Sequence, residues 1–292
     1  MNRKMILLAI VTLALVSLAC SININLPAQA KTGPTQTEEI NVPFLVDPQA
    51  IADVTLNFGA GKLNVQPGAE NALISGTAKF NVADFKPKIT IDSNNINIEQ
   101  GNIKLTGIPY INQNIVNEWD LSLGNRPTSL AIKAGAYTGS FELGGLSLHR
   151  LDVTDGAADV KMSFSKSNLV EMVALNYTTG ASTVNLSGIA NANLTDMSFH
   201  SGAGTYTLDF SGQLGRDMTV NVESGVSTVK IIIPQGVAAN LVNDSSLVTV
   251  TSSGGWEQHG NNYQLSGSGY SITLSVKMGA GTLQLETSTP SR

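Results

Sequence analysis

The chain of 292 residues contains few charged and few aromatic side chains: 13% are Asp, Glu, Lys or Arg, and 5% are Phe, Trp or Tyr. About a quarter of the residues in a soluble domain are usually charged, so most of this surface must carry uncharged polar groups. The formal net charge is -5, and the sequence has no run of Lys and Arg that could neutralise phosphates. The composition therefore excludes a nucleic-acid-binding protein.

Cysteine is nearly absent, because Cys20 is the only one. A single cysteine cannot form a disulfide within the chain. The three histidines, His149, His200 and His259, have no companions at the spacing of metal ligands, so a structural zinc site has no support. We expect neither a metal ion nor a cofactor.

Long hydrophobic runs are also absent after residue 20. Residues 1–19 hold two cations, Arg3 and Lys4, and an apolar run over 5–16. This pattern predicts a secretory signal peptide, because the run is shorter than the ~20 residues of a spanning helix. The segment ends at Cys20 and resembles a bacterial lipoprotein signal, although Ser17 and Leu18 differ from the usual residues.

The lipoprotein resemblance implies that Cys20 is acylated and becomes the mature N-terminus. Acyl chains contribute ~0.8 kcal/mol per buried methylene, and two or three of them give stable anchoring. We expect an extracytoplasmic protein anchored to the bacterial cell membrane; the alternative is an ordinary signal peptide with an incidental cysteine. Residues 20–45 contain Pro27, Pro34 and Pro43 and few large apolar residues, which predicts a flexible, lipid-anchored tether.

A repeat organises the rest of the chain, and a glycine marks its centre. Counting from that glycine, positions -5 and -3 are apolar or aromatic in every copy, and position +1 is Ala except at Val226. Positions +4 and +6 are apolar except at Gly139. The seven central glycines, which we interpret as structural corners, are Gly59, Gly135, Gly156, Gly180, Gly202, Gly225 and Gly279.

Apolar residues alternate with polar ones on both sides of the glycine, which is the periodicity of a β-strand. The inward positions are odd-numbered before the glycine and even-numbered after it. The chain must therefore bend there, which we attribute to the tolerance of glycine for positive φ. Two geometries fit: stacked β-hairpins, or a β-solenoid in which each copy is one rung. The steps of 21, 24, 22 and 23 residues from Gly135 to Gly225 leave about ten residues for a return path. Those returns contain apolar residues such as Leu146, Leu169 and Leu194, which favours the solenoid.

The predicted fold is all-β: a right-handed β-helix-like stack of rungs with two to three strands and 21–24 residues each. We divide the chain into a signal peptide (1–19), a tether (20–45), an N-terminal β-subdomain (46–127), the repeat region (128–287) and a tail (288–292). The N-terminal subdomain begins the stack and closes one end. Residues 231–271 form an irregular rung or two before the last copy, and such atypical terminal units act as caps.

A family resemblance is carried by glycines, core aliphatics and a tryptophan, in GAGKLNV, LISGTAKF, ITIDSNNINIEQ, EWDLSL and LAIKAGAYTGSFELGGLSLHRLDVTDGAADVKMSF. Through these segments the chain resembles the toast-rack family of bacterial adhesin-like proteins, related to the C-terminal domains of cell-wall stress-response membrane proteins. The resemblance covers residues 50–290 and is strongest over 54–165. It implies a fold, and most members have no assigned activity, so it does not fix a function.

Candidate catalytic groups are scattered. Asp155 and Asp159 flank one corner, and Asp209, Asp217 and Glu223 lie near others. We interpret them as solvated residues on outer faces rather than as the converging carboxylates that a glycan-cleaving enzyme needs. The aromatic residues Trp256, Tyr263 and Tyr270 could stack on a sugar ring, although a core or cap role is the stronger interpretation.

These observations favour a non-enzymatic lipoprotein on the cell surface that uses uncharged sheet faces for adhesion or for contacts within the envelope. Its expected partners are the membrane, through the lipid anchor, and another envelope protein or a surface glycan; nucleic acid is excluded. Two alternatives are a sensor or regulatory partner in an envelope stress response and a glycan-binding or glycan-active β-helix protein. A groove with clustered carboxylates would favour the enzyme, and a large exposed apolar patch would favour a protein partner.

Overall fold

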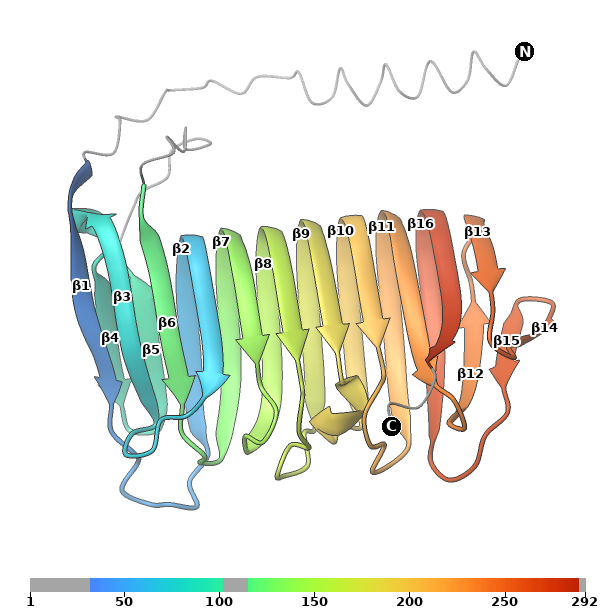
Figure 1. The fold of residues 1–292 in the computed structure, drawn as a ribbon, viewed down its shortest axis with the longest axis horizontal. Helices are drawn as coiled ribbons and strands as arrows, with labels where there is room; N and C mark the ends of the chain where they lie inside the picture. Colours follow the sequence, from blue (N-terminus) through green and yellow to red (C-terminus); the bar gives the residue numbers. More distant parts are fainter. Residues whose placement is uncertain (1–31, 102–114, 289–292) are drawn as a thin grey trace, which may run out of the picture.

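The computed structural model describes residues 32–101 and 115–288. Their strands form one continuous 16-stranded sheet that coils along a single axis (Figure 1). The helical elements among these residues are two short 3₁₀ turns, η1 (Ala83–Phe85) and η2 (Ile189–Ala192). The all-β prediction is therefore confirmed.

The centre of the molecule is a stack of seven long strands, one for each repeat copy. Neighbouring strands of the stack pair in parallel. From one end of the stack to the other, the strands are β2 (Ala52–Pro67), β7 (Thr128–Glu142), β8 (Leu148–Ser163), β9 (Ala174–Ser187), β10 (Asp196–Asp209), β11 (Met218–Pro234) and β16 (Ser271–Ser288).

Equivalent repeat positions of neighbouring strands pair with one another. Leu175 of β9 is paired with Leu151 on one side and with Met197 on the other. In a hairpin, positions -3 and +4 of the same copy would face each other, whereas in this stack every partner comes from a different copy. This register confirms the solenoid and shows that the alternative of stacked hairpins is wrong.

The corner glycines lie on top of one another along the stack, and close approach explains them. A Cβ added to Gly225 would lie 2.6 Å from the carbonyl oxygen of Gly202, and one added to Gly180 would collide with the carbonyl oxygen of Gly156. None of the seven corner glycines has a positive φ, so the predicted reason, tolerance for positive φ, is wrong. The positive φ occurs two residues later in some copies, as at Gly281, where φ is 133°.

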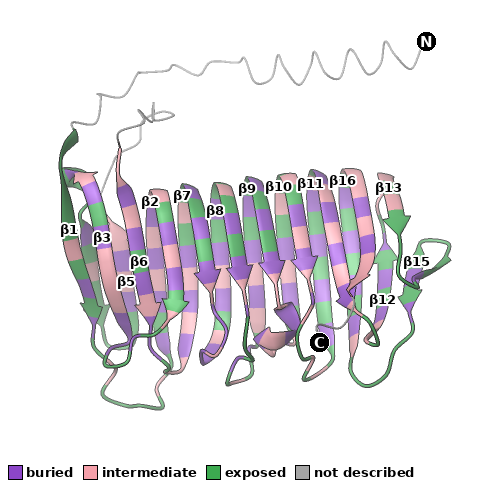
Figure 2. Ribbon diagram, in the orientation of Figure 1, coloured by how far each residue is buried: buried purple, intermediate pink, exposed green. Residues whose placement is uncertain are grey.

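The inward rows predicted by the repeat form one continuous core. Side chains at positions -5, -3, +4 and +6 are buried in rung after rung, as at Leu151, Val153, Val160 and Met162. Figure 2 shows the resulting alternation of buried and exposed residues along each strand. Burial of apolar surface on this scale is the main contribution to folding, and the repeat therefore defines the core.

The return segments complete each rung, and asparagine side chains fasten them. Asn168 is buried; its side-chain oxygen accepts from the Leu148 amide at 2.9 Å and its Nδ2 donates to the Leu148 carbonyl at 2.8 Å. Asn191 similarly donates to the carbonyl of Phe164 at 2.9 Å. Leu146 and Leu194 point inward as expected, but Leu169 is 58% exposed, so its predicted inward position is wrong.

At the N-terminal end, the two halves of β2 pair with separate strands. The first half pairs with β5 (Asn95–Gln100), which in turn pairs with β4 (Pro87–Asp92). The second half pairs with β6 (Asn117–Leu123), followed by β3 (Ile74–Val82) and β1 (Thr32–Val42). This region begins the stack and covers its end.

The flexible tether predicted for residues 20–45 is wrong over residues 32–42, which form strand β1. Residues 32–42 pair antiparallel with β3, and Ile40 and Val42 are buried. Backbone hydrogen bonds to an existing sheet edge hold this segment, and they need few apolar side chains. A flexible tether is therefore excluded for this part of residues 20–45.

At the C-terminal end, strand order in space departs from the order in the sequence. After β11 the chain leaves one strand position of the stack empty and forms the next rung from β12 (Ala238–Asn243) and β13 (Leu247–Ser252). A hairpin of β14 (Glu257–His259) and β15 (Asn262–Leu265) follows. The chain then returns as β16 into the space between β11 and the β12–β13 rung. The expectation that residues 231–271 lie between the last two copies is wrong. Residues 231–234 end β11 and Ser271 begins β16, whereas the segment from β12 to β15 caps the outside of the last copy.

Candidate functional site

Each corner has an inner and an outer side made by neighbouring residues. Positions -1 and +2 point into the rung, as the buried Asp155, Thr179 and Ser182 show. Positions +1 and +3 point outward, as the exposed Ala181 and Thr183 show. In-register stacking turns each position into a row along the solenoid, so the corner has two rows inside and two rows outside. In the middle rungs the inner rows carry polar side chains, which we call together the inner row.

The inner side of the corner holds a buried carboxylate in its middle rungs. Asp155 is 6% exposed. The hydroxyls of Tyr177 and Tyr137 donate to its Oδ2 at 2.8 and 3.3 Å. Thr179 and, at 3.4 Å, Ser182 donate to its Oδ1. Both carboxylate oxygens therefore have donors, which a buried charge requires.

The network continues through later rungs as paired hydroxyls. Ser201 donates to Ser224 at 2.8 Å, and Ser224 lies 2.6 Å from the hydroxyl of Ser227. At both ends of the stack the same position -1 carries an apolar residue, Phe58 or Met278, and both are buried. The polar row is thus confined to the middle of the solenoid.

Burial controls the acid–base chemistry of the two tyrosines. Desolvation, followed by the nearby Asp155 charge, raises the pKa of Tyr137 far above its ordinary value of 10. Burial also raises the pKa of Tyr177, and its interactions with Tyr137 and Asp155 add to the effect. Both tyrosines are neutral donors at any physiological pH.

This network stabilises the fold and is too enclosed to serve as a surface site. The prediction that Asp155 is a solvated face residue is wrong, because position -1 points inward. Asp159, at the outward position +3 of the same copy, is exposed as expected. The repeat itself could have shown that Asp155 points inward. Asp155 stands at position -1, and the apolar residues Phe58 and Met278 occupy the same position in two other copies.

The outer side of the corner carries a band without charge across five neighbouring rungs, which we call the uncharged strip. One of its rows is threonine: Thr183, Thr205, Thr228, Thr282 and Thr249 are paired in that order. The row beside it is Ala181, Ala203, Val226, Ala280 and Leu247. Val226 is 66% exposed and Leu247 73% exposed, and parallel strands repeat every 4.7–4.9 Å or so. The strip therefore presents hydroxyl and methyl groups at a fixed interval.

The outer face before the corner is different, because it contains charges. His200 lies 3.3 Å from Glu223 at position -2 of neighbouring copies, and Arg150 is 2.6 Å from Asp152. Exposed pairs of this kind contribute little to stability. The uncharged strip thus combines regular spacing with an absence of charge in its two rows over five rungs. Charge returns farther from the corner on the same face, where Lys230 lies 2.9 Å from Glu286.

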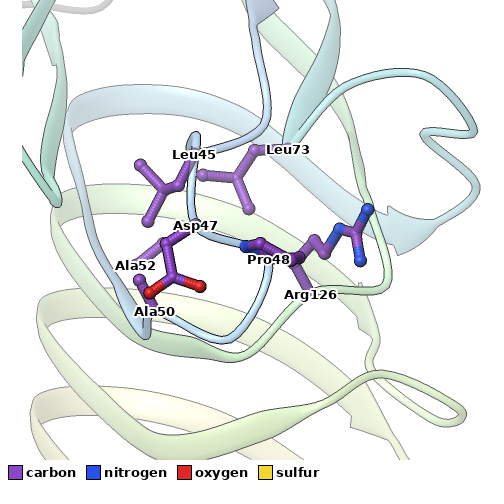
Figure 3. Close-up of a pocket in the computed structure, with 7 residues that line it drawn as sticks. All are labelled: Leu45, Asp47, Pro48, Ala50, Ala52, Leu73 and Arg126. Carbon is purple, nitrogen blue, oxygen red and sulfur yellow. The ribbon is translucent and has the colours of Figure 1, made fainter.

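Two hollows of the described surface are small. One has a volume of about 200 Å³ and is lined by Asn64, Val65, Gln66, Asp120, Leu121, Ser140 and Glu142. The other, beside the loop that follows β1, is lined by Leu45, Asp47, Pro48, Ala50, Ala52, Leu73 and Arg126 (Figure 3). It holds almost no space for even a water molecule, whereas small-molecule pockets have volumes of about 300–1,000 Å³. Arg126 instead lies over the ring of Phe44, 4.8 Å from its centroid. We assign this hollow no ligand.

The three aromatic residues of the predicted sugar platform are not equivalent. Trp256 and Tyr263 are buried at 9% and 4% exposure and belong to the core cluster, whereas Tyr270 is 52% exposed. Two of the three rings thus pack in the C-terminal cap, which is the core role that the sequence favoured. Stacking of a sugar on Tyr270 stays a prediction.

Other predicted features concern anchoring and metal binding. Cys20, the predicted lipidation residue, lies outside the described residues. Within residues 32–101 and 115–288, no three His, Asp or Glu side chains form a group that could hold a metal ion. In the same ranges, no helix has both the length and the hydrophobicity needed to cross a bilayer.

Comparison with solved structures found likenesses at low sequence identity. A "putative cell adhesion protein" from Clostridium sporogenes is 19% identical, with 87% of this chain and 100% of that chain covered and a TM-score of 0.49. A "putative lipid binding protein" from Parabacteroides distasonis is 9% identical, with 86% and 97% covered and a TM-score of 0.39. A "putative adhesin" from Bacteroides fragilis is 11% identical, with 88% and 99% covered and a TM-score of 0.35. No curated protein matches the chain.

One family model matches a large part of the chain. The model describes the N-terminal domain of toast_rack (DUF2154), and it matches residues 31–174 and 167–232. These ranges include the N-terminal end of the stack and the rungs through β11. Because the match extends over more than half of the sequence, the protein belongs to the toast-rack family.

Proposed function

We propose that the protein is a non-enzymatic adhesion module of the cell surface and that the uncharged strip is its contact surface. The observation that supports this most is the in-register row of five threonines beside a row of small apolar residues. Threonine hydroxyls can form hydrogen bonds with an extended polymer, while the Ala, Val and Leu side chains cover its apolar faces. A polysaccharide presents both kinds of group in a repeating array.

Single contacts of this kind are weak, because an exposed hydroxyl exchanges one hydrogen bond with water for another. Many copies on one surface change this, since each further contact becomes intramolecular and avidity exceeds the individual affinity by orders of magnitude. Adhesion by the strip therefore requires dense display.

Anchoring through Cys20 would provide that density. Acyl chains on this residue would hold many copies in one membrane plane, with residues 21–31 between the anchor and β1. Replacing Cys20 with Ser should release the protein from membranes, measured by fractionation and immunoblotting. Unchanged membrane retention of the Cys20→Ser protein would contradict the anchor.

The adhesion proposal is tested with beads that display the protein at equal density on an insoluble polysaccharide, purified peptidoglycan sacculi. The strip variant carries Thr183→Glu and Thr205→Glu, which put two charges on neighbouring rungs. The matched control carries Thr154→Glu and Thr178→Glu, also exposed and paired on neighbouring rungs but before the corner. We expect at least a tenfold loss of bead retention for the strip variant alone. Equal retention of both variants would contradict the proposed surface.

A further inference from the structure

Among the described residues, four strands pair on one side only and so form the edges of the sheet: β1, β4, β13 and β14. The free N–H and C=O groups of such an edge attract strands of other chains, and proteins usually block edges with proline, charge or short length. The four edges of this sheet are not equally blocked, and the difference locates a site of association.

Three of the edges carry blocking features. Strand β1 contains Pro34 and the acidic pair Glu38 and Glu39, and Lys86 contacts Glu38 at 3.1 Å. Strand β4 begins at Pro87 and includes Lys88, which lies 3.4 Å from Glu99. Strand β14 has three residues, Glu257 to His259. Addition of a strand to any of these edges would meet a proline, a charge or too few backbone groups.

Strand β13 lacks all of these features. Its six residues, Leu247 to Ser252, read LVTVTS and include no charge and no proline. Leu247 is 73% exposed. Val248 and Val250 pack against the core but are only partly buried, because no strand of the described chain lies beyond them. Both the backbone and the inward side chains of β13 are therefore incompletely covered.

We propose that β13 pairs antiparallel with β13 of a second copy, which gives a two-fold symmetric dimer. A strand of alternating inward valine and outward threonine needs a partner with the same alternation, and β13 itself provides it. Opposite residues in an antiparallel pair must point to the same side of the sheet. Centring the pair on Thr249 meets this requirement, since Val248 then faces Val250 of the partner and Thr249 faces Thr249 of the partner.

This register also fits the chemistry of the edge. No like charges meet, because β13 carries none, and the valines of the two copies cover each other. An isologous contact of this kind closes after two copies and so avoids a growing fibre. The pair would also join the threonine rows of the two copies through Thr249, although the dimer is independent of any adhesive role of the strip.

Disulfide trapping tests the pair in the full-length chain, with Cys20→Ser as background. At the centre of the register, the two Cα atoms of residue 249 are about 4.5–5.5 Å apart, within the range of about 4.4–6.8 Å for a disulfide. Thr249→Cys should therefore form covalent dimers on mild oxidation. Thr205→Cys, which lies in the same row on an interior rung, should stay monomeric under identical conditions.

The register predicts a second, more specific result. Leu247→Cys and Thr251→Cys should cross-link when the two proteins are mixed, and each should cross-link poorly alone. Two copies of residue 247 are four positions out of register, about 14 Å apart at about 3.4 Å per residue. Absence of Thr249→Cys dimers, equal dimers from Thr205→Cys, or cross-links to a different protein would overturn the proposal.

Charge complementation measures the same contact without a covalent bond. Thr249→Lys and Thr249→Glu each put like charges opposite one another across the two-fold axis. Sedimentation equilibrium should show at least a tenfold loss of dimer for each variant alone and recovery of dimer when the two are mixed. Circular dichroism shows whether each variant is folded. A monomeric unmodified protein, or folded Lys and Glu variants that dimerise as well as it does, would overturn the pair.

Discussion

The inner and outer sides of each corner differ in chemistry although one or two residues separate them in the sequence. Inside, Asp155 and its hydroxyl donors are buried and fully engaged with one another. Outside, Thr205 and Ala203 are exposed and form a band without charge. The comparison indicates that the inner row maintains the rung and that the outer row is free to evolve contacts. Substitutions at the two sides should therefore affect different properties.

The largest loss of stability is expected from a substitution at a corner glycine, where the inner and outer sides meet. In Gly180→Val, the added Cβ would collide with the carbonyl oxygen of Gly156, and neither strand can move without breaking the parallel ladder. We expect a loss of about 3 kcal/mol in the free energy of unfolding, measured with urea. Ala181→Val is the matched control, because Val226 occupies that position in another copy. An unchanged melting temperature for Gly180→Val would show that the glycine ladder is not required.

The next effect tests the inner row. Asp155→Ala removes the acceptor of four hydroxyl groups and leaves several of them unsatisfied in the core. Each buried unsatisfied group costs about 1–3 kcal/mol, partly relieved by new pairing among the hydroxyls, so we expect a net loss of about 2–3 kcal/mol. Asp159→Ala, on the exposed side of the same strand, should change stability by less than about 0.5 kcal/mol. Equal losses for both variants would remove the distinction between the two sides.

Alkaline pH should weaken the inner row more gradually. The raised pKa values of Tyr137 and Tyr177 keep both tyrosines protonated in the folded state. Their contribution is complete below the unfolded pKa of about 10 and declines as pH rises above it, by up to about 1.4 kcal/mol per pH unit for each tyrosine. Urea unfolding at several pH values measures this slope, and Tyr177→Phe should reduce it. A slope that is the same in Tyr177→Phe would contradict the role of Tyr177.

The smallest effect on stability is expected on the outer row. Thr205→Lys exchanges an exposed side chain on an interior rung, and its free energy of unfolding should stay within about 0.5 kcal/mol of the unmodified protein. Thermal unfolding by circular dichroism measures this change. A loss comparable to that of Asp155→Ala would show that the outer row is also needed for the fold.

Much of the solenoid could be predicted because the repeat acts through local physics. Alternation places Leu151 and Val153 inside, and the change of parity at Gly156 requires a bend. The position of β16 could not be predicted in this way, because its apolar rows can stack equally well on β11 or beyond the cap. Its insertion between β11 and the β12–β13 rung depends on long-range pairing that adjacent residues do not encode.

The errors at single residues have similar causes. Aspartate is rarely buried, which favours an outer position for Asp155, yet its place in the repeat points inward and four hydroxyls surround it. The strand over 32–42 is hard to predict because its outer residues are polar and backbone bonds to β3 hold it. For the uncharged strip, the composition predicted uncharged faces, but the alignment of five threonines needed the observed register.

Retention of densely coated beads on peptidoglycan sacculi is the most direct test of the outer row as a contact surface. The Thr183→Glu, Thr205→Glu variant should lose at least tenfold in retention at unchanged stability. The Thr154→Glu, Thr178→Glu variant, with the same two charges before the corner, should be retained like the unmodified protein. Equal retention of all three proteins would contradict adhesion through the uncharged strip.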